Sequence, residues 1–90
     1  MWKGIAARLK KNGVKVSQAV GIYLPSFGDL DRKIAVQRYG FRPYNLIGVD
    51  KDNAVVRLMK KRGNLCIHGE LQDVIDSWPK KTRLDFIFAD

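Results

Sequence analysis

Hydrophobic residues occur along this chain in four short continuous runs. The runs span residues 20–24, 46–49, 65–67 and 84–89, and the last contains one polar residue, Asp85. Continuous apolar runs of this length, bounded by turn residues such as Pro25, are typical of strands that are buried on both faces of a sheet. We therefore expect four strands, with Ile47, Val49, Ile87 and Phe88 among the residues buried in one sheet.

Segments with helical spacing precede and separate these runs. The first has apolar residues three or four positions apart with basic residues opposite them, and it ends at the turn-forming pair Asn12 and Gly13. Its apolar residues are Trp2, Ile5, Ala6 and Leu9. A second helix should follow Ser26, which together with Asp29 is similar to a capping box, and should end at Gly40.

Two more helices are predicted after the second run. Asp52 or Asn53 should cap the third helix, whose last turn is basic and precedes Gly63. Its expected buried stripe is Val55, Leu58 and Met59. The fourth helix should end at Pro79. Its expected buried residues are Leu71, Val74, Ile75 and Trp78.

The alternation of strands and helices predicts a single Rossmann-like α/β domain over residues 1–90. Strands joined by helical crossovers favour a mostly parallel, right-handed open sheet with helices on both faces. If the chain reverses direction after its third strand, the order is 3-2-1-4. Residues 1–13 then form a basic amphipathic helix ahead of the α/β unit of residues 16–90.

The charge of the chain is more informative than its overall composition. Hydrophobic residues make up 46% and charged residues 29%, as in an ordinary globular protein, but 17 basic against 9 acidic residues give a net charge of +8. Residues 1–15 carry five basic side chains and no acidic one, and residues 51–63 carry five and one. The N-terminal five are Lys3, Arg8, Lys10, Lys11 and Lys15. Such clusters favour contact with the phosphates of a nucleic acid, with solubility as the alternative reading.

Residue counts exclude several classes of protein. The single cysteine, Cys66, lies in an apolar run and cannot form a disulfide within the chain, so we expect a core thiol in a cytoplasmic protein. No apolar stretch is long enough to span a bilayer, so no membrane partner is expected. His68 is the only histidine and the chain has no pair of spaced cysteines, which argues against a metal site. Trp2 and Trp78 lie on apolar helix faces and should pack in the core.

Three acidic residues follow predicted strands and are candidates for binding chemistry. Asp50 and Asp90 close the second and fourth apolar runs, and Glu70 follows the third. Ligands bind at the carboxyl ends of strands in open α/β sheets, and a carboxylate there can accept two hydrogen bonds from the cis-diol of a ribose. Glu70 could accept from an adenine amino group. The alternatives are that Asp50 begins the next helix and that Glu70 is a solvated turn residue.

The order of these segments resembles the N-terminal half of a class I S-adenosylmethionine-dependent methyltransferase. The resemblance covers residues 16–90 and rests on Phe27-Gly28-Asp29 in the first loop and on NLIGVDKDNAVV, CIHGELQDVI and LDFIFAD. It implies that the first loop passes the methionine part of the cofactor, that Asp50 holds the ribose hydroxyls, and that Asp90 opens the catalytic substrate motif. The implied cofactor-binding residues are Pro25, Ser26, Gly28, Asp50, Lys51, Gly69, Glu70 and Leu71.

This resemblance predicts a methyltransferase, or its cofactor-binding part, that acts on nucleic acid. A nicotinamide-dependent oxidoreductase would require G-x-G-x-x-G where the chain has PSFGDL. The alternative function is a small basic protein that binds nucleic acid without catalysis. The fold would be an incomplete methyltransferase fold, because the fourth strand is an apolar edge that should pair with further chain or with another subunit.

Overall fold

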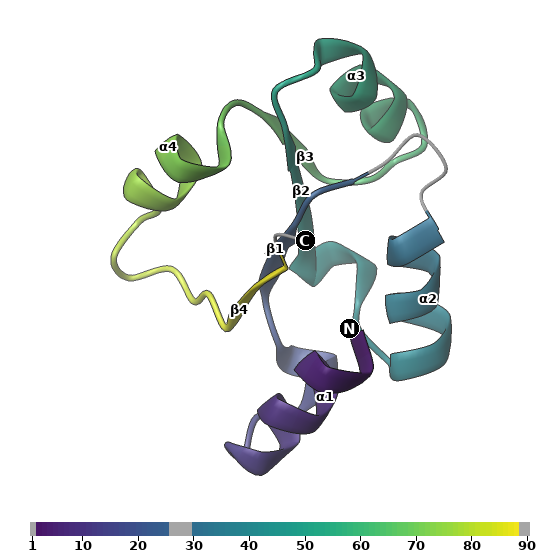
Figure 1. The fold of residues 1–90 in the computed structure, drawn as a ribbon, viewed down its shortest axis with the longest axis vertical. Coiled ribbons are helices and arrows are strands. Elements are labelled where there is room, and N and C mark those ends of the chain that lie inside the picture. Colours follow the sequence, from purple (N-terminus) through teal and green to yellow (C-terminus); the bar gives the residue numbers. More distant parts are fainter. Residues whose placement is uncertain (1, 26–29, 89–90) are drawn as a thin grey trace.

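Four parallel strands form the centre of the structure, a computed structural model that describes residues 2–25 and 30–88 (Figure 1). The strands are β1 (Gly21–Tyr23), β2 (Leu46–Asp50), β3 (Cys66–His68) and β4 (Phe86–Phe88). They lie in the order β3-β2-β1-β4, and β1 pairs in parallel with both β2 and β4. The predicted Rossmann-like α/β class and strand order are confirmed. That the outer edge of β4 pairs with further chain stays a prediction.

Helices cover the two faces of this sheet unequally. One face carries α1 (Trp2–Lys11), α2 (Leu30–Tyr39) and α3 (Asn53–Lys61), and the other carries the six-residue α4 (Leu71–Asp76) (Figure 1). Two short 3-10 helices, η1 (Val16–Gln18) and η2 (Pro43–Asn45), lead into β1 and β2. The sheet is therefore well covered on one face and only partly covered on the other.

Local signals explain where the helices begin and end. Asp52 caps α3 because its Oδ1 accepts a hydrogen bond from the Ala54 amide at 2.9 Å. Gly63 has φ +80° and follows α3, and the adjacent Asn64 amide donates back to the Met59 carbonyl at 2.9 Å. Gly40, at φ +83°, ends α2 in the same way. The capping box predicted at Ser26 and Asp29 lies outside the described residues.

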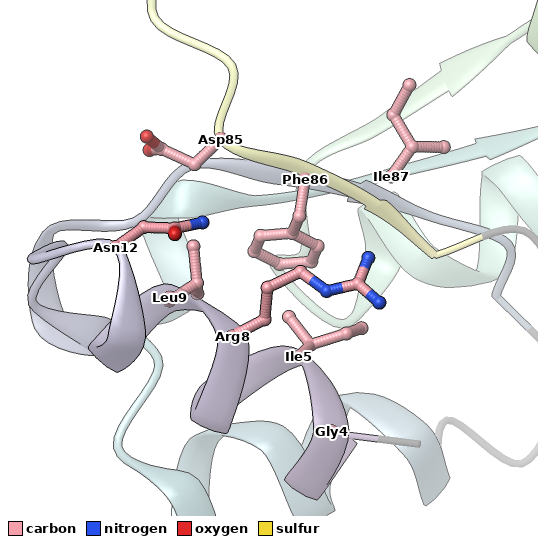
Figure 2. Close-up of a pocket in the computed structure, with 8 residues that line it drawn as sticks. All are labelled: Gly4, Ile5, Arg8, Leu9, Asn12, Asp85, Phe86 and Ile87. Atoms are coloured by element: carbon pink, nitrogen blue, oxygen red, sulfur yellow. The ribbon is translucent and has the colours of Figure 1, made fainter.

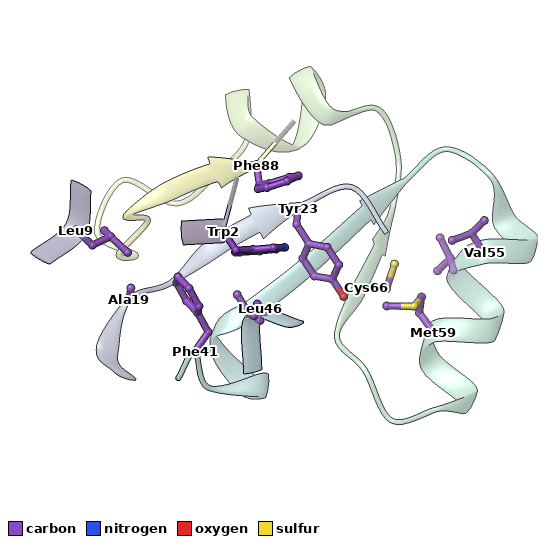
Figure 3. Packing of buried hydrophobic residues seen from close by; sticks show 12 residues of the cluster. Trp2, Leu9, Ala19, Tyr23, Phe41, Leu46, Val55, Met59, Cys66 and Phe88 are labelled. Carbon is purple, nitrogen blue, oxygen red and sulfur yellow. The ribbon is translucent and has the colours of Figure 1, made fainter. Parts of the chain in front are cut away.

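An aromatic cluster joins α1 to the β4 edge of the sheet. Trp2 is 4% exposed, and its ring stacks on Phe88 with centroids 4.7 Å apart and an interplanar angle of 15° (Figure 3). Phe41 and Phe86 meet the Trp2 ring edge-on at 5.3 and 5.8 Å. The Phe86 ring occupies the place where a Cβ on Gly21 would lie, so only glycine fits at that position in β1. The prediction that Trp2 is a packing residue is confirmed.

The opposite face of the sheet corrects part of the burial prediction. Ile22, Val49 and Val74 form a small buried cluster there beneath α4, but Ile87 is 41% exposed and Ile47 only half-buried. All these residues of β1, β2 and β4 share one face because side chains alternate along a strand. The prediction that Ile87 is buried is wrong because Ile87 lies on the edge strand β4, outside the buried cluster of Ile22, Val49 and Val74. Val49 and Phe88 are buried as predicted.

Three smaller boundary predictions also need correction. Val56 is buried in α3, where Leu58 was expected, and Leu58 is half-buried. The strand β3 starts at Cys66, and Leu65 before it is 47% exposed although its carbonyl accepts from the Gly48 amide. Trp78 lies beyond the end of α4 and is half-buried. Trp78 nevertheless packs against the buried cluster of Ile22, Val49 and Val74, as its predicted packing role requires.

Candidate functional site

A pocket of about 270 Å³ lies at the carboxyl ends of β1, β2 and β3. Its lining residues are Leu24, Val49, Asp50, Lys51, Gly69, Glu70 and Leu71. Five of these, from Asp50 to Leu71, are residues that the sequence predicted to bind a cofactor. The structure thus brings together two loops that lie about 20 residues apart in the chain, because β2 and β3 are neighbours in register at Asp50 and His68.

The carboxylate of Asp50 is held in place by the backbone that follows it. Its Oδ1 accepts a hydrogen bond from the Asp52 amide at 2.8 Å. Asp50 therefore contributes to the start of α3, as the alternative reading of the sequence proposed. Its Oδ2 accepts no hydrogen bond from any residue that the structure describes.

Two hydrogen bonds tie the β2 loop to the β3 loop. The Gly69 amide donates to the Asp50 carbonyl at 3.0 Å, and Nε2 of His68 lies 3.1 Å from the Lys51 carbonyl oxygen. These bonds fix the relative position of the two loops that form the pocket. His68 serves this backbone contact, and within residues 2–25 and 30–88 no cluster of three or more His, Cys, Asp or Glu side chains could hold a metal ion.

Glu70 places a second carboxylate beside the pocket. It is the N-cap residue of α4, but its side chain makes no capping hydrogen bond to the helix, and the residue is exposed. Glutamate is not among the residues that usually cap a helix, so the Glu70 carboxylate lies beside the pocket without a capping role. Leu71 begins α4 and packs against the cluster around Ile22, which supplies an apolar wall.

Sequence reasoning missed two of the residues that line the pocket. Leu24 and Val49 lie at the carboxyl ends of β1 and β2 and line the pocket together with the two acidic residues. The strand order was sufficient to find them, because residues at the ends of neighbouring parallel strands lie at one edge of a sheet. Pro25 is buried, and its Cγ would lie 3.2 Å from a Cβ added at Gly48, so Pro25 packs over β2. Ser26, Gly28 and Asp90, also predicted for the site, lie outside the described residues.

The thiol of Cys66 lies beneath this site in the core. Cys66 is 8% exposed, and burial raises the pKa of its thiol above the ordinary value of 9.0, with the nearby Asp50 carboxylate adding to the increase. A thiol with a raised pKa stays protonated at neutral pH and is a poor nucleophile. Cys66 is therefore a packing residue, as predicted.

The basic residues predicted to bind nucleic acid do not all face the same way. All five are exposed, but Arg8 lines a groove of about 390 Å³ between α1 and β4, together with Ile5 and Phe86 (Figure 2). Lys10 and Lys15 instead line a hollow on the α2 side of α1. Neither surface adjoins Asp50, so the basic residues and the acidic pocket are separate features.

No protein-family model, curated protein or solved structure matches the chain. Among the residues that the structure describes, no helix is both long enough and apolar enough to cross a membrane.

Proposed function

We propose that this chain binds S-adenosylmethionine at the Asp50 pocket, as the cofactor-binding part of a methyltransferase. The observation that supports the proposal is that the carboxylates of Asp50 and Glu70 line one pocket at the carboxyl ends of parallel strands. Asp50 uses only Oδ1 to bond the Asp52 amide, and Glu70 makes no capping bond to α4. Ribose hydroxyls and an adenine amino group are hydrogen-bond donors, and both need acceptors at this edge.

The pocket residues fit a nucleoside in a specific orientation. Asp50 would accept from the ribose hydroxyls through Oδ2, while its Oδ1 stays bonded to the Asp52 amide. Glu70 would accept from the amino group of adenine. Leu24 and Leu71, which are half-buried, would pack against the faces of the base. A planar apolar ring between aliphatic side chains with a few placed polar groups is the usual composition of such sites.

The cofactor would supply an activated methyl group, and the chain would contribute orientation rather than covalent chemistry. Holding the two reactants in line converts transfer into an effectively unimolecular step, which is a large part of catalysis in such reactions. Among the residues that the structure describes, Asp50 and Glu70 would hold the nucleoside part of the cofactor. Asp90, predicted to lie near the methyl acceptor, is outside the described residues.

Calorimetric titration with S-adenosylhomocysteine tests this proposal. We expect the folded chain to bind S-adenosylhomocysteine at one site. Adenosine should bind more weakly than S-adenosylhomocysteine, and NAD should bind no more tightly than adenosine. A folded chain that gives neither heat nor a change in melting temperature would contradict the proposal. Preference for NAD would instead favour the nicotinamide-dependent alternative.

A second candidate function, binding of nucleic acid without catalysis, is favoured by the distribution of charge. Residues 1–49 carry nine basic and two acidic side chains, whereas residues 50–90 carry eight and seven. Nearly all of the net charge of +8 therefore belongs to the segment that forms α1, η1 and α2. Residues 51–63 form a second basic cluster with five basic and one acidic side chain, and clusters of this kind favour a polyanionic partner.

A further inference from the structure

A hollow of about 480 Å³ lies between the end of α1, η1 and the end of α2. Its polar lining consists of Lys10, Lys15, Ser17 and Tyr39, and no lining residue is acidic. The hollow adjoins η1, which leads into the amino end of β1, whereas the Asp50 pocket lies at the carboxyl ends of the strands. The two sites therefore lie at opposite edges of the sheet.

The chemistry of the hollow matches the parts of a nucleotide. Lys10 and Lys15 are exposed and can place two ammonium groups on phosphate oxygens. Ser17 adds a hydroxyl donor. The Tyr39 ring, which is half-buried, offers an aromatic surface beside these groups, and the Arg38 guanidinium carbon lies 6.0 Å from its centroid. Aromatic rings among cationic side chains are the means by which proteins hold single-stranded nucleic acids.

An anionic membrane, a nucleic acid duplex and a single-stranded nucleic acid could each provide negative charge for this hollow. The burial of α1 and the stacking of bases distinguish among them. An anionic membrane would require the apolar side of α1, but Trp2 and Leu9 are 4% and 6% exposed and belong to the core. In a duplex the bases stack on one another and present no free face to Tyr39, whereas in a single strand each base has such a face. We infer that this hollow binds single-stranded nucleic acid, with Lys10 and Lys15 on the phosphates and Tyr39 stacked on a base.

This inference goes beyond cofactor binding and does not depend on it. Sequence reasoning found Lys10 and Lys15 through the run of basic residues, but Tyr39 and Ser17 become relevant only because α2 packs against α1. A site at the amino ends of the β-strands holds the nucleic acid at a distance from the Asp50 pocket. Nucleic-acid binding and cofactor binding should therefore be separable by mutation.

Tyr39→Leu tests the stacking contact, because leucine keeps the apolar packing of α2 and removes the aromatic face. The probes are a fluorescent single-stranded thymidine dodecamer and an abasic dodecamer with the same phosphates, measured by anisotropy at about 50 mM salt, where phosphate contacts are strong. We expect the wild-type chain to bind the thymidine strand about fivefold or more tightly than the abasic strand. In Tyr39→Leu that preference should disappear, whereas Tyr44→Leu, which changes an exposed tyrosine outside the hollow, should keep it.

Charge reversal tests the phosphate contacts. The double variant Lys10→Glu with Lys15→Glu should bind both strands at least tenfold more weakly, and its salt slope should flatten by about 0.7 for each lost contact. Lys60→Glu with Lys61→Glu carries the same charge change on α3, outside the hollow, and should have a much smaller effect. Melting temperatures of all variants establish that they fold.

Three results would overturn the inference. Equal wild-type affinity for the thymidine and abasic strands would show that no base stacks on Tyr39. Equal loss in the Lys10 and Lys15 double variant and in the Lys60 and Lys61 double variant would show that the binding is diffuse electrostatic attraction. Tighter wild-type binding to a duplex of the same length, or to phosphatidylserine vesicles, would assign the surface to a different polyanion. Affinity for S-adenosylhomocysteine should be unchanged in the Lys10 and Lys15 double variant. If the wild type binds no cofactor, the measurements with single-stranded nucleic acid still test this inference, because the two sites are separate.

Discussion

The amide of Asp52 donates to Oδ1 of Asp50 at 2.8 Å, so the residue predicted to bind ribose also helps to begin α3. Asp52 in turn caps α3 through the Ala54 amide at 2.9 Å. The two neighbouring acids thus form a short chain of hydrogen bonds, in which only Asp50 reaches the pocket. A structural role and a binding role of Asp50 are compatible because its two oxygens can serve different partners.

Substitution of these two acids should separate the two roles. Asp50→Ala should weaken binding of S-adenosylhomocysteine by about 2 kcal/mol or more, as expected when a charge-assisted hydrogen-bonding partner is lost. Asp52→Ala removes a helix cap and should lower the free energy of unfolding by about 0.5 to 2 kcal/mol, with little loss of affinity. Calorimetric titration and urea unfolding of both variants provide the measurements. Equal affinity of the Asp50→Ala variant and the wild type would leave Asp50 with the structural role alone.

Two neighbouring isoleucines should differ in their contribution to stability. Ile22 and Ile47 are partners in register on the α4 face of the sheet, but Ile22 is 0% exposed and Ile47 only half-buried. Ile22→Ala should therefore lower the free energy of unfolding by about 2 to 5 kcal/mol, and Ile47→Ala by clearly less. Urea unfolding measures both values. A larger cost for Ile47→Ala would show that the exposed part of this face is covered in solution.

The sheet and its order could be predicted from the sequence because the apolar runs, helix caps and glycine stops agreed with one another. Asp52, Gly40 and Gly63 act locally, and each has its predicted effect. Burial was harder to predict. The exposure of Ile87 depends on how the helices cover the sheet, and the contribution of Tyr39 to a hollow depends on how α2 packs on α1. These are tertiary relationships, and no local pattern in the sequence specifies them.

Trp2 should be one of the residues on which the stability of the domain depends most. Its ring contacts Phe88, Phe41 and Phe86, so it joins α1 to β4 and to the segment that follows α2. Trp2→Ala should cost about 3 to 5 kcal/mol, a large part of the stability of a domain of this size. Its Nε1 is buried and has no hydrogen-bond partner among the residues that the structure describes, so Trp2→Phe removes an unsatisfied donor and should cost less than about 2 kcal/mol. Urea unfolding followed by circular dichroism would show the order, and a Phe variant as unstable as the Ala variant would contradict it.

The free energy of unfolding should depend on pH in a way that reports the raised pKa of the buried Cys66 thiol. Burial, and after it the Asp50 carboxylate, raise the pKa of the thiol above 9.0 in the folded chain, so the folded state binds this proton more tightly than the unfolded state. The resulting stabilisation is complete below pH 9.0 and is lost as the pH rises through the higher folded value. Cys66→Ala lacks this contribution, so its free energy of unfolding should fall less steeply above pH 9.0 than that of the wild type.

Alkylation of the same thiol gives a second, independent measurement. Iodoacetamide reacts with the thiolate, so the folded chain should react more slowly at pH 8 than the urea-unfolded chain, whose thiol has its ordinary pKa. Asp50→Asn removes the carboxylate that adds to the increase, and in this variant the pH at which alkylation becomes fast should move down. The Cys66 reaction would then report the charge at Asp50 without any ligand present. Equal rates in the folded and unfolded wild-type chain would show that Cys66 is accessible and that its proton contributes nothing to stability.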